Sequence, residues 1–84
     1  MLHNLNDLIA DLLDVPVTDL APNTGPENLP AWDSLAHVTI VAGVEETYKV
    51  QLTMPEILAI RSIADLRKTL EGHGVAAEDM GSAG

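Results

Sequence analysis

The sequence predicts an all-α fold, a small four-helix bundle with three longer helices, a short third helix and a long crossover after the first. Apolar residues recur at helical spacing in three segments, and proline and glycine gather between them. The 84 residues suffice for one small domain with a single core. Hydrophobic residues make up 46% of the chain, with one Trp, one Tyr and no Phe, so that core must be aliphatic.

The first helix is expected from residue 5 to about Leu13. Asn4, followed by Asp7 three residues later, resembles a capping box. Pro16 cannot continue the helix and favours extended geometry in the residue before it. The apolar stripe of this helix consists of Leu5, Leu8, Ile9 and Leu12.

Residues 15–33 have no helical period and contain four prolines and Gly25. A loop of this length is unusual in so small a domain, which indicates either a function or packing by the loop itself. We predict an ordered crossover with a turn at Thr24-Gly25-Pro26. Its expected apolar anchors on the core are Val17, Leu20, Leu29 and Trp32.

The remaining helices follow from capping residues and apolar spacing. Asp33 or Ser34 is suited to cap a helix over 34–48, and Gly43 inside it costs about 1 kcal/mol relative to Ala, so packing must hold this helix. Thr53 with Glu56 forms a capping box for a short third helix. The last helix starts after Ser62 and ends at Gly72 and Gly74, which gives a domain over 1–73 and a flexible tail over 74–84. The expected apolar faces contain Val38, Val41, Val44 and Tyr48 in the second helix, and Ile63, Leu66 and Leu70 in the last.

Charge and composition exclude several classes of function. The net charge of −9 repels phosphate backbones, which argues against nucleic acid and favours partners with basic patches. The chain has no Cys, so disulfides and thiolate metal sites are excluded. No apolar run approaches the length of a membrane span, and no signal-peptide pattern opens the chain. We therefore expect a soluble cytoplasmic monomer.

Ser34 is the candidate functional residue. Its hydroxyl lies where free amide groups and the positive end of a helix dipole point outward, which suits a covalently attached phosphate. The simpler interpretation is that Ser34 only caps the helix and that the protein is an acidic helical adaptor.

Catalysis and metal binding have weaker support. Asp33, Ser34 and His37 contain the residue types of a hydrolase triad, but Asp33 adjoins Ser34 and is poorly placed to orient His37, which we expect to face solvent. Metal binding has no suitable ligand spacing, because His3, His37 and His73 are scattered.

One segment leads from the long crossover into the second predicted helix of this acidic bundle: Leu29-Pro30-Ala31-Trp32-Asp33-Ser34-Leu35. This segment, in that position, resembles the acyl carrier protein family. The resemblance runs from about residue 2 to 72. It includes the Glu45-Glu46 pair, the capped short third helix and Ser62-Ile63-Ala64-Asp65-Leu66.

The resemblance implies that Ser34, flanked by Asp33 and Leu35, receives 4′-phosphopantetheine from coenzyme A through a magnesium-dependent phosphopantetheinyl transferase. The thiol of the arm would carry acyl or aminoacyl groups as thioesters between synthase enzymes, ketosynthases among them. The protein would be a carrier and not a catalyst. The lack of Cys fits, since the thiol comes with the prosthetic group.

Partner docking is expected on the second helix, with apolar contacts near Ser34 and acidic steering further along. Thr39 and Ala42 replace the acid and the bulkier apolar residue common in the family, and Trp32 and Pro30 replace a Gly-rich approach. These departures resemble discrete carriers of polyketide, nonribosomal peptide or related specialised pathways more than carriers of fatty-acid synthesis. The expected docking residues are Leu35, Val38, Thr39, Ala42, Glu45 and Glu46.

Overall fold

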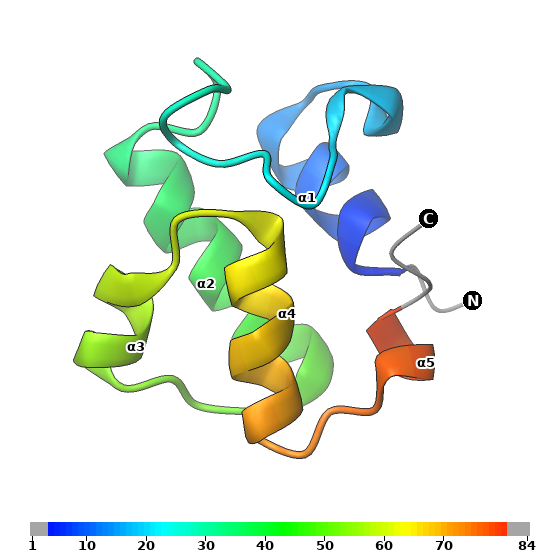
Figure 1. The fold of residues 1–84 in the computed structure, drawn as a ribbon, viewed down its shortest axis with the longest axis vertical. Helices are drawn as coiled ribbons and strands as arrows, with labels where there is room; N and C mark the ends of the chain where they lie inside the picture. Colours follow the sequence, from blue (N-terminus) through cyan, green and yellow to red (C-terminus); the bar gives the residue numbers. More distant parts are fainter. Residues whose placement is uncertain (1–3, 81–84) are drawn as a thin grey trace.

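The computed structural model describes residues 4–80 and confirms a helical bundle, with no strand in that range (Figure 1). The bundle measures 30 × 28 × 19 Å. Within the described range, no helix has both the length and the apolar character needed to cross a bilayer. The elements are α1 (Leu5–Leu13), a 3-10 turn η1 (Val17–Asp19), α2 (Ser34–Tyr48), α3 (Met54–Ala59), α4 (Ile63–Gly72) and a short α5 (Ala77–Met80).

Four side chains fix the starts of the main helices. Each accepts a hydrogen bond from the backbone N–H three residues later, which satisfies one of the amides that a helix start leaves free. These caps are Asn4, Asp33, Thr53 and Ser62, with N···O distances of 2.8, 2.8, 3.4 and 3.1 Å. At Thr53 the predicted capping box with Glu56 is complete.

The core is aliphatic around a single tryptophan. Trp32 is 1% exposed and lies among residues from α1, α2 and α4. Gly43 of α2 faces Leu12 of α1, and a Cβ at position 43 would come within 2.8 Å of the Leu12 side chain. The glycine that weakens α2 as an isolated helix therefore permits close packing of α1 against α2. Fully buried core residues include Leu5, Ile9, Ile40, Val44, Ile63, Leu66 and Leu70.

The crossover is ordered because its backbone docks on the start of α4. The carbonyls of Pro22 and Thr24 accept hydrogen bonds from the amides of Ala64 and Ile63, both at 2.9 Å. Gly25 lies so near the Arg61 carbonyl that a Cβ at position 25 would overlap it.

Three of the four predicted crossover anchors pack on the core. Leu20 and Trp32 are buried, and Leu29 is partly buried against the core. The fourth, Val17, is 42% exposed, so that prediction is wrong. Val17 lies in η1, and Leu20 at the end of this turn takes the buried position instead.

The segment after α4 differs from the flexible tail predicted over 74–84. Val75 packs against the core, α5 follows, and Met80 is fully buried. Arg67 of α4 donates a hydrogen bond from Nη2 to the Met80 carbonyl at 3.2 Å. A single buried methionine has no periodic apolar neighbours, so the sequence pattern gave no sign of it. Residues 81–84 lie outside the described residues, and the domain boundary at residue 73 stays a prediction.

Candidate functional site

The start of α2 leaves the Ser34 hydroxyl available. Of the two candidate caps, Asp33 takes the role: its Oδ1 accepts the Ala36 amide at 2.8 Å. Ser34 is then the first residue of the helix, is exposed, and has no hydrogen-bond partner for its hydroxyl among residues 4–80. A capping serine would have its oxygen engaged by a backbone amide, whereas this oxygen is open to an incoming group.

A cavity of about 680 Å³ opens beside Ser34, between α2 and α3. Its polar side chains are Asp33, Ser34 and His37, and the other walls are apolar. Ala42, one of the expected docking residues, is not among the lining residues. The apolar walls consist of Pro26, Trp32, Val38, Val41, Met54, Ile57, Leu58 and Ile60.

His37 bridges the crossover and α3. The indole Nε1–H of Trp32 donates to His37 Nδ1 at 3.0 Å, and His37 Nε2 lies 2.9 Å from the Ile57 carbonyl oxygen. Because Nδ1 accepts, it carries no proton, and the Nε2–H donates to the carbonyl. The ring is half-buried. The prediction that His37 faces solvent is therefore wrong, since both nitrogens have partners within the bundle.

The same contacts speak against a hydrolase. A triad needs a histidine nitrogen that takes the serine proton and an acid that orients the ring. Here the lone pair of His37 Nδ1 is directed to Trp32, and the Asp33 carboxylate caps the Ala36 amide. The structure does not assemble Asp33, Ser34 and His37 into a catalytic relay.

Four exposed apolar side chains, which we term the apolar rim, belong to this region: Val38, Met54 and Leu58 line the cavity, and Leu35 follows Ser34 in α2. Leu35 and Val38 of α2 are 76% and 62% exposed, and Met54 and Leu58 of α3 are 64% and 69% exposed. Large apolar side chains gathered at one surface commonly mark a binding site. Sequence reasoning missed the two α3 residues because a six-residue helix is too short to show which face is buried.

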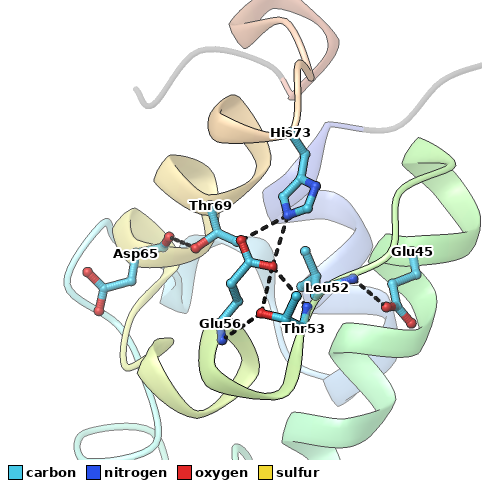
Figure 2. A network of polar contacts seen from close by, with 7 residues as sticks. All are labelled: Glu45, Leu52, Thr53, Glu56, Asp65, Thr69 and His73. Carbon is cyan, nitrogen blue, oxygen red and sulfur yellow. Dashed lines mark hydrogen bonds and ion pairs between the residues drawn. The ribbon is translucent and has the colours of Figure 1, made fainter.

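The other predicted docking residues of α2 are not equivalent. Thr39 and Ala42 are exposed, and the Thr39 hydroxyl donates to the Leu35 carbonyl at 3.0 Å. Glu46 is exposed, as expected. Glu45 is half-buried, and its Oε2 accepts the Leu52 amide at 2.8 Å (Figure 2). Glu45 therefore holds the loop between α2 and α3 and does not project freely into solvent.

A second polar cluster ties α3 to α4. The Glu56 carboxylate accepts the Thr53 amide at 2.9 Å and lies 2.9 Å from Nε2 of His73, the residue that follows α4 (Figure 2). The Thr53 amide, and then the His73 ring, lower the pKa of Glu56 because both favour the charged carboxylate. Of the three histidines, His73 thus has a structural contact, and His3 lies outside the described residues.

Comparison with known families gives one match. A family model described as a phosphopantetheine attachment site matches residues 4–70, a range that runs from the cap of α1 to the last turn of α4 and contains Ser34. No curated protein matches the chain.

Proposed function

Since this chain belongs to the phosphopantetheine attachment site family, we propose that Ser34 is the residue that carries its 4′-phosphopantetheine. The observation that carries the proposal is the cap at Asp33, which leaves the neighbouring hydroxyl exposed and unbonded at a helix N-terminus. A phosphodiester on Ser34 Oγ would meet the first-turn amides and the positive end of the α2 dipole. The arm supplies a terminal thiol that holds acyl groups as thioesters.

The function that follows is that of an acyl carrier protein. It holds acyl or aminoacyl intermediates and passes them between biosynthetic enzymes, while the chain itself supplies attachment, shelter and docking. We assign it to a polyketide, nonribosomal peptide or related specialised pathway, because Trp32 and Pro30 depart from the Gly-rich approach of fatty-acid carriers. A cytoplasmic location stays a prediction from the sequence.

The cavity is the proposed shelter for the load. Its volume of about 680 Å³ lies within the ordinary range of small-molecule sites, and its walls away from Ser34 are apolar. A load joined to Ser34 through a flexible arm can fold back into this space. Apolar acyl chains are the class favoured by such walls, because each buried methylene is stabilised by about 0.8 kcal/mol.

Docking is proposed on the apolar rim, with the exposed Glu46 as an acidic residue further along α2. The rim gives a partner apolar contacts next to Ser34, and the net charge of −9 steers enzymes with basic patches toward it. The phosphopantetheinyl transferase and the synthase enzymes would share this face. Their association is expected to weaken as salt rises, because the steering acts between exposed charges.

The test of the attachment site is intact mass after incubation with coenzyme A, magnesium and a broad-specificity phosphopantetheinyl transferase. Wild type and Thr47→Ala, which removes an exposed hydroxyl at the other end of α2, should each gain one phosphopantetheine. Ser34→Ala should gain none while keeping its thermal unfolding temperature. An unmodified wild type, under conditions that load a control carrier, would favour the acidic adaptor instead.

A further inference from the structure

We propose that His37 is a positioning residue that holds α3 against α2 and thereby sets how well the cavity covers a load attached at Ser34. The inference rests on the proposed function of the cavity. It assigns a specific task to a side chain that neither attachment nor docking requires.

The first support is the weak anchoring of α3. This six-residue helix has no buried residue of its own, although it supplies Met54, Ile57 and Leu58 to the cavity wall. Leu52 and Ile60 are buried just outside α3, and Ile57 is only partly buried against the core. Apolar burial therefore holds the two ends of this segment, and polar contacts decide how the helix between them lies.

The second support is the position of the contact. Within residues 4–80, the His37–Ile57 hydrogen bond is the one that joins α2 directly to α3, and both residues line the cavity. The contact of Glu56 with His73 secures α3 from the opposite neighbour, α4. The width of the cavity between α2 and α3 is therefore set at His37.

The third support is that Trp32 fixes the donor. By donating to Nδ1, the indole N–H selects the neutral tautomer whose Nε2–H faces the Ile57 carbonyl. Trp32 is 1% exposed, so this selection comes from a rigid part of the core. The two bonds also leave His37 no free donor or acceptor for the cavity, which keeps that wall compatible with an apolar load.

The experiment compares His37→Gln with His37→Phe. Glutamine keeps one acceptor and one donor on neighbouring atoms, whereas phenylalanine keeps an aromatic ring without either. Each variant is loaded from octanoyl-coenzyme A or acetyl-coenzyme A, and complete loading is verified by intact mass. The readout is the rate at which hydroxylamine cleaves the thioester, taken as the ratio of the acetyl to the octanoyl rate.

We expect hydroxylamine to cleave the octanoyl thioester about fivefold faster on His37→Phe than on the wild type, because one hydrogen bond is lost. The cleavage rate of the acetyl thioester should not change. His37→Gln should retain most of the protection, and Thr47→Val, at an exposed threonine of α2 that does not line the cavity, should match wild type. Equal protection in all variants would overturn the proposal. So would equal loss in the Gln and Phe variants, because hydrogen bonding would then not be the cause.

A second measurement stands even where a variant folds poorly. Long-range proton–nitrogen NMR of the wild-type imidazole should show His37 protonated at Nε2 and bare at Nδ1; the opposite tautomer would contradict the geometry. If neither the wild type nor the variants could be loaded, the result would count against Ser34 as the attachment site. Full loading with unchanged cleavage ratios would count against His37 alone.

Discussion

The two ends of α2 use their side chains differently. At the amino end, Ser34 is exposed and unbonded, Leu35 and Val38 are uncovered, and a cavity opens toward α3. At the carboxyl end, Glu45 accepts the Leu52 amide, and the loop that follows leads into the capping box of α3.

The difference shows how one helix serves both binding and stability. Exposed apolar side chains at the amino end contribute little to folding and are available to a ligand or partner. At the carboxyl end, Glu45 accepts the Leu52 amide, and together with Glu56 of α3, which accepts the Thr53 amide, it fixes where α3 begins. The three predictions below test this contrast, in order of decreasing effect.

The largest effect on stability is expected from Trp32, which is buried beneath the exposed surface at the amino end of α2. Trp32→Ala should lower the free energy of unfolding by about 3–5 kcal/mol, because it empties a fully buried site. Leu35→Ala should change it by less than about 0.5 kcal/mol, since that side chain is 76% exposed. Urea denaturation measures both. A comparable loss in the two variants would show that the apolar rim is not a free surface.

A smaller difference in stability is expected between substitutions at Glu45 and at Glu46. Glu45→Gln should lower the free energy of unfolding by about 1–2 kcal/mol, because it weakens a charge-assisted bond to the Leu52 amide. Glu46→Gln should leave stability unchanged and slow association with a basic partner enzyme. Urea denaturation and stopped-flow binding give the two readings. If both substitutions act alike in both assays, the structural distinction between these residues fails.

The smallest expected effect is the contribution of Glu56 to the pH dependence of the free energy of unfolding. Its pKa in the folded protein lies below the ordinary value of 4.5, so the stabilisation is fully present above pH 4.5 and is lost as pH falls through the lower folded value. Glu56→Gln should flatten this part of the curve of unfolding free energy against pH. Glu46→Gln serves as the exposed control and should keep the wild-type slope. A wild-type slope in Glu56→Gln would assign the acid sensitivity to other carboxylates.

The sequence predicted local features well because their causes are local. The caps Asn4, Thr53 and Ser62 each act on an amide three residues away, so residue type and spacing suffice to place a helix start. The start of α2 was predicted from the same rule, although the sequence left Asp33 and Ser34 as alternative caps. The apolar stripes likewise identified part of the core, because burial follows helical period: Leu5, Ile9, Val41, Val44, Ile63, Leu66 and Leu70 are buried. Val38 of the predicted α2 stripe is 62% exposed, so its assignment to the buried face is wrong.

Contacts between distant segments were beyond that reasoning. His37 and Ile57 are twenty residues apart, and nothing in the residues near His37 indicates that a carbonyl of α3 will face its ring. The bond between Glu45, an expected docking residue, and the Leu52 amide was not predicted, because the α2–α3 loop that returns to Glu45 has no periodic signature. Val17 and Met80 show the same limit: an isolated apolar residue does not reveal whether a neighbouring segment will cover it.

Gly25 carries a consequence for how this fold can vary. Because its α-carbon is pressed against the Arg61 carbonyl, even a methyl group there would drive the crossover away from the linker before α4. The close packing of the segment that leads into Ser34 thus depends on position 25 having no side chain. Among carriers of this architecture, tolerance of replacement at position 25 should be as low as in the hydrophobic interior, and a ranking of sites by side-chain burial alone would overlook it.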